Sequence, residues 1–150
     1  NRHRLMWMDA KYEPGTVKDI AYDDNGKVAE EKEIRTAGQP YQIVLDADRK
    51  TITADGEDIS FVTVSVVDKN GVPCPTATNQ LKFKVSGAGT YRAACNGDAT
   101  SLEMFHKDTM KLFSGKLVVL VKSKTTAGDI KLEVNGAGLK SGKLTLEAKK

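Results

Sequence analysis

The chain has 150 residues and a formal net charge of +3, from 23 Lys and Arg side chains against 20 Asp and Glu. A charge of this size does not supply the concentrated basic face that nucleic-acid binding needs, and no apolar run approaches the ~18–20 residues of a membrane span. With 39% hydrophobic and 29% charged residues, the chain can build a core, and its length suits one domain or one domain plus a fragment of another.

Residues 1–38 are predicted to form a partial, three-stranded β unit. Apolar and polar residues alternate over residues 5–10, 17–22 and 28–35, and Pro-Gly and Asn-Gly turns separate these stretches. Three strands and a single Trp make a thin core, so we expect this unit to need a partner surface. Trp7 is assigned to that core, and the sheet around it is a candidate interface, with stacking of Trp7 on a sugar as the alternative. Residues 37–40, Ala-Gly-Gln-Pro, are the predicted linker.

Residues 39–150 are predicted to form an immunoglobulin-like antiparallel β-sandwich, which makes the fold class all-β. Alternations of strand period recur between turn residues, and no amphipathic helix of ten or more residues is found. Seven strands are expected, over residues 41–45, 61–67, 81–85, 91–95, 117–121, 130–134 and 144–147.

Three of these strands carry specific expectations. Val62, Val64 and Val66 are predicted to point inward. Residues 117–121 are apolar on both faces, which favours a central strand or one with a covered outer face. In the strand at 91–95, Tyr91, Ala93 and Cys95 are expected to share one face.

The basic residues gather in the last third of the chain, where residues 107–150 hold 10 basic and 4 acidic side chains. Lys131 and Lys143 alternate with apolar residues, as on the solvated face of a sheet, and no aromatic residues interleave with them as in single-strand binders. We therefore expect no nucleic-acid partner.

The residues that usually hold metals or form disulfides are sparse. Cys74 and Cys95 are either free thiols or one disulfide. The acidic stretch 46–58 offers oxygen ligands for calcium, but its spacing does not match a calcium loop, so solvated surface carboxylates are favoured. His3 and His106 are isolated, and we expect no metal or cofactor.

The stretch from Asn96 to His106 is long for a sandwich connection. It begins with polar residues, Asn96 and Asp98, continues through Glu103, and ends with Phe105 and His106. Long loops of mixed chemistry often form contact surfaces, so an interface or a weak glycan contact is one interpretation. The other is a loop that folds back and buries its apolar residues.

Several segments taken together resemble a known family. They keep their order along nearly the whole chain, at residues 12–15 (YEPG), 25–28 (NGKV), 33–38 (EIRTAG), 46–52 (DADRKTI), 54–58 (ADGED), 62–64 (VTV), 68–71 (DKNG), 75–79 (PTATN), 83–87 (FKVSG), 96–100 (NGDAT) and 138–141 (GLKS). They are similar to the C-terminal, non-catalytic immunoglobulin-like region of bacterial glycoside hydrolase family 2 enzymes of the β-galactosidase type.

The resemblance implies a parent enzyme that hydrolyses terminal β-galactosides with retention, using two glutamates on a barrel that this chain does not contain. Residues 1–38 would then be the tail of a preceding immunoglobulin-like domain, and residues 39–150 a terminal sandwich. The expected partners are the catalytic and other accessory domains of the same polypeptide. The resemblance also implies export to the periplasm or cell surface, although the fragment carries no signal peptide.

Three other functions are compatible with the sequence. A carbohydrate-binding module would need an exposed aromatic platform, for which Trp7, Tyr91 and Phe105 are the candidates. A structural repeat of a bacterial surface adhesin would use a similar sandwich. An enzyme in its own right is the least favoured, because no pair of carboxyl groups is recognisable as a glycosidase site.

Overall fold

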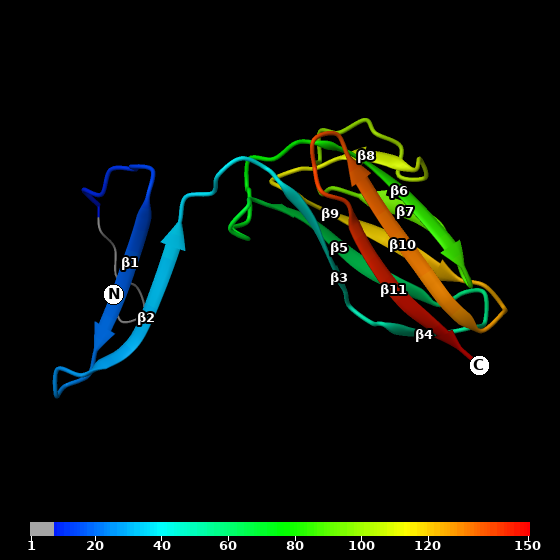
Figure 1. Cartoon of the computed structure of the whole chain (residues 1–150), viewed down its shortest axis with the longest axis horizontal. Coiled ribbons are helices and arrows are strands. Elements are labelled where there is room, and N and C mark those ends of the chain that lie inside the picture. Colours follow the sequence, from blue (N-terminus) through cyan, green and yellow to red (C-terminus); the bar gives the residue numbers. More distant parts are fainter. Residues whose placement is uncertain (1–7) are drawn as a thin grey trace. The chain divides into compact units, whose positions relative to one another are not determined.

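The structure, a computed structural model, describes residues 8–150, and strands are its only extended regular elements (Figure 1). Within this range no helix is long and apolar enough to cross a membrane. The chain divides into two units, with the boundary between Thr36 and Ala37.

The first unit contains an antiparallel ribbon of β1 (Thr16–Tyr22) and β2 (Val28–Arg35). Its turn is fixed by Asp23, whose carboxylate accepts the N–H groups of Asn25 and Lys27 at 2.9 Å each. Nearly every side chain of the ribbon is exposed. Of the further strand expected over residues 5–10, residues 8–10 are not extended into a strand, and residues 5–7 lie outside the described part of the chain.

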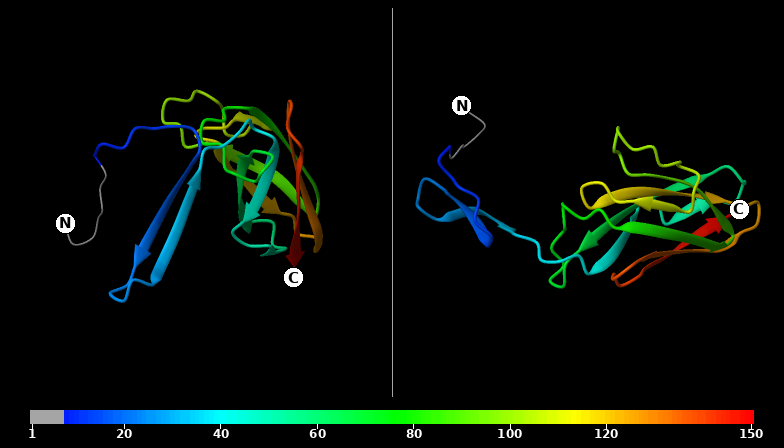
Figure 2. Two further views of the ribbon diagram at one scale, coloured as in Figure 1. Left: turned by 60° about the vertical axis from the view of Figure 1, so that its left-hand side comes forward. Right: turned by 90° about the horizontal axis from the view of Figure 1, so that it is seen from above.

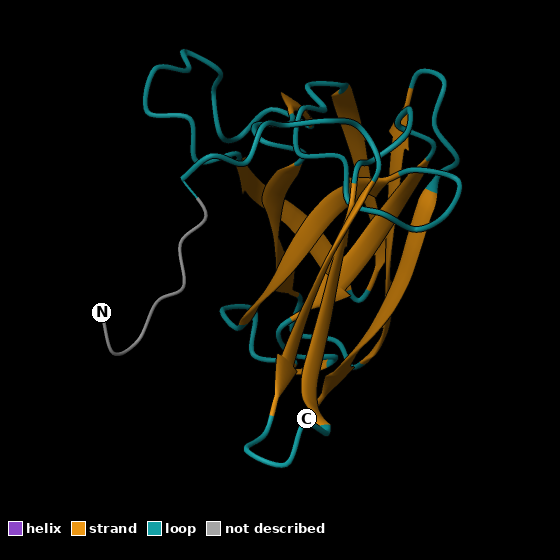
Figure 3. Cartoon of the chain, turned by 90° about the vertical axis from the view of Figure 1, so that its left-hand side faces the viewer, coloured by secondary structure: helices purple, strands orange, loops and turns teal. Residues whose placement is uncertain are grey.

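The second unit has nine strands in two sheets that face each other (Figures 1 and 3). One sheet has the order β4-β11-β10-β6-β8 and the other β3-β5-β9-β7. The strands are β3 (Gln42–Ala47), β4 (Thr51–Thr53), β5 (Ile59–Val67), β6 (Gln80–Gly87), β7 (Gly89–Cys95), β8 (Thr109–Lys111), β9 (Lys116–Ser123), β10 (Gly128–Gly136) and β11 (Gly142–Lys149).

The core lies between the two sheets because alternate residues of each strand point inward. Val62, Val64 and Val66 of β5 are all buried, as predicted. They form one cluster with side chains of the opposite sheet such as Leu132 and Leu146. This confirms an all-β sandwich in which nearly all strand pairs are antiparallel, the exception being the parallel pair β4–β11.

All seven expected strands of this unit are present, and β9 is central, flanked by β5 and β7. Two three-residue strands, β4 and β8, were not predicted. They are too short to show an alternating pattern, and they are the two edge strands of the five-stranded sheet.

The predicted orientation of β7 is wrong beyond Tyr91. Tyr91 lies opposite Val121 and Ala93 opposite Leu120, so Arg92 is an extra residue that forms a β-bulge. A bulge shifts the alternation by one residue. As a result Ala94 points into the core and Cys95 is exposed.

Candidate functional site

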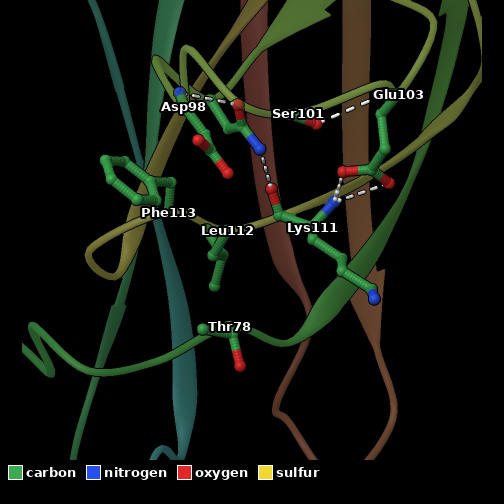
Figure 4. Close-up of a pocket in the computed structure, with 8 residues that line it drawn as sticks. Thr78, Asp98, Ser101, Glu103, Lys111, Leu112 and Phe113 are labelled. Atoms are coloured by element: carbon green, nitrogen blue, oxygen red, sulfur yellow. Dashed lines mark hydrogen bonds between the residues drawn. The ribbon is translucent and has the colours of Figure 1, made fainter.

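The connection between β7 and β8 is the longest in the sandwich, and it stands out from the sheets (yellow-green in Figure 2). Its first half borders an open hollow of about 470 Å³. Figure 4 shows side chains from this loop facing residues of the β8 segment and of the connection before β6. The lining residues are Thr78, Asn96, Asp98, Ser101, Glu103, Lys111, Leu112 and Phe113.

Hydrogen bonds within the hollow hold the loop in place. The Asn96 side-chain amide donates to the carbonyl of Lys111 at 3.0 Å and accepts the N–H of Asp98 at 3.0 Å. The Glu103 carboxylate accepts the N–H of Lys111 at 3.1 Å. These polar groups therefore help to shape the loop, because each of them bonds to the backbone of another segment or of the loop itself.

Asp98, a carboxylate that lines this hollow, is not suited to act as a general acid. The Thr100 hydroxyl and N–H both donate to Asp98, and these bonds lower the pKa of Asp98 below its ordinary value. A general acid near neutral pH needs a raised pKa. Asp98 therefore stays ionised and is a poor proton donor.

The second half of the loop presents apolar side chains to solvent. Leu102 is 98% exposed, Met104 55% and Phe105 57%. The structure thus differs from the interpretation in which the loop folds back to bury Met104 and Phe105. Leu102 and Met104 also line a second open hollow, of about 380 Å³.

Hydrogen bonds connect the end of this apolar segment to β7. The N–H of Ala94 donates to the Phe105 carbonyl at 2.8 Å, and the Tyr91 hydroxyl lies 3.0 Å from the same oxygen and 2.5 Å from that of Lys107. Burial, with a smaller contribution from Asp108, raises the pKa of Tyr91 to about 12, so the hydroxyl keeps its proton. The loop is therefore a fixed surface feature with apolar residues at its tip.

The structure brings together only some of the residues that the sequence singled out. Asn96, Asp98 and Glu103 line the same hollow, whereas Phe105 and His106 are exposed farther along the loop and do not line it. Trp7 lies outside the described residues. Sequence reasoning missed Thr78, Lys111, Leu112 and Phe113, which reach the hollow through the fold and not through proximity in sequence.

The aromatic platform expected of a sugar binder is only partly present. Tyr91 stacks on Phe83 inside the sandwich, with ring centroids 5.7 Å apart and an interplanar angle of 8°. Its ring is consequently not available as a flat exposed surface. Of the three candidates, Phe105 is the one that the structure describes as exposed.

The acidic stretch of residues 46–58 fixes local structure. Asp48 accepts hydrogen bonds from the Ser60 hydroxyl and the Phe61 N–H, and Asp58 forms an ion pair with Arg49 at 2.8 Å. Asp55 accepts the N–H groups of the two residues at 57 and 58. In residues 8–150 no group of three or more His, Cys, Asp or Glu side chains is placed to hold a metal ion.

The two cysteines are free thiols in the structure. Cys74 is buried, and this burial raises its pKa. Cys95 is exposed at the end of β7, on the outer side of its sheet. The alternative of a Cys74–Cys95 disulfide is therefore not realised.

Comparison with known proteins points to one family. Residues 43–145 match the family described as "Glycoside hydrolase family 2 C-terminal domain 5". A β-galactosidase from Bacteroides ovatus is 44% identical over 138 residues, which are 92% of this chain and 16% of that protein. A β-glucuronidase from Formosa agariphila is 29% identical over 152 residues, covering 99% of this chain and 15% of its own length.

A solved structure shows the same arrangement of strands. A glycosyl hydrolase family 2 member from Bacteroides cellulosilyticus superposes with a TM-score of 0.87 at 28% identity, covering 94% of this chain and 18% of the other. The chain thus spans about one sixth of the length of the curated relatives that it matches. In each relative this region is a small part of a larger polypeptide.

Proposed function

Because the chain belongs to the glycoside hydrolase family 2 C-terminal domain 5 family, we propose that it is a non-catalytic accessory module of a retaining β-galactosidase. The observation that carries this proposal is the match of nearly the whole chain to 16% of a β-galactosidase. A module of this kind supports the enzyme by packing against its other domains. Interfaces between domains of one chain typically bury roughly 600–1,500 Å².

The proposed parent substrate is a terminal β-galactoside. The higher identity to the β-galactosidase, 44% against 29% for the β-glucuronidase, supports galactosides over glucuronides. The catalytic glutamates of the parent are assigned to its remaining length, and none is assigned to this chain.

The ribbon of β1 and β2 is proposed to complete the sandwich of a preceding domain. An isolated two-stranded ribbon is marginally stable in water, and Val17 and Ile34, which lie opposite each other, are both exposed. Packing against further strands of the same polypeptide would bury these two residues.

The test uses the full-length parent, a deletion variant that lacks this region, and the purified 150-residue chain. We expect the parent to hydrolyse a chromogenic galactoside, the deletion variant to lose thermal stability or activity, and the chain added in trans to restore part of the loss. The chain alone should not hydrolyse the galactoside. Hydrolysis by the chain, or a deletion variant as stable and active as the parent, would contradict the proposal.

A second candidate function, carbohydrate binding, is supported by the exposed Phe105 ring on the β7–β8 loop, other residues of which line two open hollows. Calorimetric titration of the chain with galactosides and polysaccharides tests it directly. Binding that Phe105→Ala abolishes and Phe61→Ala, at an exposed Phe that lines neither hollow, leaves intact would favour this function over a purely architectural one.

A further inference from the structure

The two sheets of the sandwich have outer faces of different chemistry. On the five-stranded sheet, the outward positions of the neighbouring strands β10 and β11 are all polar, as expected for an antiparallel sheet with one face in water. These positions are Asp129, Lys131, Glu133 and Asn135 of β10, and Lys143, Thr145, Glu147 and Lys149 of β11.

The four-stranded sheet departs from this pattern. Phe61 of β5 lies opposite Leu120 of β9, and Leu120 lies opposite Ala93 of β7, so the three form a row across the sheet. Phe61 is 47% exposed, although it is a large aromatic residue within a strand. An outward apolar row on a sheet that has solvent as its only neighbour is unfavourable.

The next row extends this apolar surface. Val118 of β9 lies between Thr63 and Cys95, and the three side chains point to the same outer face. Lys116 and Lys122 flank the two rows along β9. The two edge strands add charged residues at the ends of these rows: Asp46 of β3 lies opposite Thr63, and the exposed Arg92 precedes Ala93 in β7. A centre depleted of charge inside a polar rim is the usual anatomy of a protein–protein interface.

We infer that the outer face of the β3-β5-β9-β7 sheet, centred on Phe61, Leu120 and Val118, is the surface on which this module docks against the rest of its parent polypeptide. This inference rests on the proposed function for its choice of partner. The chain accounts for only 16% of the length of its β-galactosidase relative, so a large protein surface is tethered to this module. Tethering gives such a surface an effective concentration of about millimolar, which favours it over a second copy of the module.

The chemistry of the face agrees with a protein partner. On β5 and β9 these rows offer one polar side chain, that of Thr63, and a sugar site needs several placed polar groups. Apolar side chains from another domain would cover Phe61 and Leu120 and remove them from water. The matching polar face of the other sheet is expected to remain solvated in the intact protein.

Cys95 provides a native reporter of this surface. Its side chain is exposed beside Val118, whereas Cys74 is buried and has a raised pKa, so a thiol reagent should label Cys95 first in the 150-residue chain. In the full-length parent we expect labelling of Cys95, followed by peptide mass spectrometry, to be about tenfold slower or more, because a covered thiol reacts only when the interface opens. The control is Thr145→Cys on the polar face of β11, made in a Cys95→Ser background, which should be labelled at equal rates in the chain and the parent.

Two further outcomes decide the inference. Phe61→Lys in the parent should restore rapid labelling of Cys95, whereas Lys131→Glu on the opposite face should not. Equal labelling rates of Cys95 in the chain and in the parent would overturn the inference. Slower labelling of Cys95 in the isolated chain at higher chain concentration would also overturn it, because it would identify a second copy of the chain as the partner. Because labelling does not depend on galactoside hydrolysis, a negative result here is distinct from failure of the proposed function.

Discussion

Asp58 shows how a single carboxylate holds the connection between β4 and β5. It accepts the N–H of Thr53 at 2.8 Å and pairs with the Arg49 guanidinium at 2.8 Å, and these contacts lower the pKa of Asp58 to about 2. A group whose pKa is lower in the folded state stabilises the fold above its unfolded pKa of about 3.9, and the contribution disappears as the pH falls through the folded value.

Asp58→Asn is therefore expected to lower the urea midpoint of unfolding at pH 7. The difference from the wild-type chain should shrink as the pH falls from about 5 to about 2, because the wild-type carboxylate then becomes protonated as well. Urea titrations at several pH values measure this. A difference that is constant over the whole range would show that the ionised carboxylate is not the stabilising form.

Gly115 and Gly138 have nearly the same φ angle but different surroundings. Their φ angles are +72° and +73°, which are unfavourable for other residues. A Cβ at Gly115 would overlap the carbonyl oxygen of Cys74, whereas a Cβ at Gly138 would meet no atom within 4 Å. Gly138→Ala should cost about 1 kcal/mol of unfolding free energy, and Gly115→Ala roughly 1–3 kcal/mol more, because it adds overpacking to the same backbone penalty. Equal losses in thermal or chemical unfolding would contradict this.

At the level of elements, the bulge in β7 gives a prediction about deletions. Arg92 has no partner on β9, so its removal leaves Tyr91 opposite Val121 and Ala94 opposite Val119. Removal of Thr63 from β5 has the opposite effect, because one half of β5 must then turn its side chains to the other face. The chain without Arg92 should fold and melt cooperatively, and the chain without Thr63 should not; circular dichroism melts distinguish them.

Long alternating strands could be predicted from the sequence, and irregular ones could not. β5, β6 and β10 are recognisable because every second residue is apolar. The bulge at Arg92 could not be predicted from the sequence, because an exposed Arg is compatible with either strand register. The Asn70–Gly71 pair predicts a hairpin turn over residues 68–71, because Asn-Gly tolerates positive φ. The turn is present, with the Gly71 N–H donating to the Asp68 carbonyl, but β5 and β6 on its two sides belong to different sheets and do not form a hairpin with each other. Local turn chemistry does not determine which strands pair.

The residues of the candidate site could likewise be predicted only in part from the sequence. Asn96, Asp98 and Glu103 are close in sequence, so their common surface could be anticipated. Lys111 and Thr78 join them only because β8 pairs with β6, a contact between distant segments. The exposure of Phe105 could not be predicted either, since an apolar residue in a loop is compatible with burial or with contact.

At the scale of the whole molecule, the two units should differ in their dependence on each other. Within the described residues, the hydrophobic core cluster draws its members from Ala37 onward, and the ribbon is exposed almost throughout. A chain of residues 37–150 should therefore keep the melting temperature of the 150-residue chain within about 2 °C. A peptide of residues 8–36 should show little strand signal in circular dichroism. A large loss of melting temperature on truncation would mean that the ribbon stabilises the sandwich.

The position of β11 also limits the order in which the strands of the sandwich can pair during synthesis of the chain. β11 comes after all the other strands of the sandwich in the sequence, yet it lies between β4 and β10, and β4 enters its sheet through β11 alone. Until β11 has left the ribosome, β4 has no neighbour and one flank of β10 is open. During that interval the nascent chain exposes strand edges to which a chaperone or another nascent chain can bind.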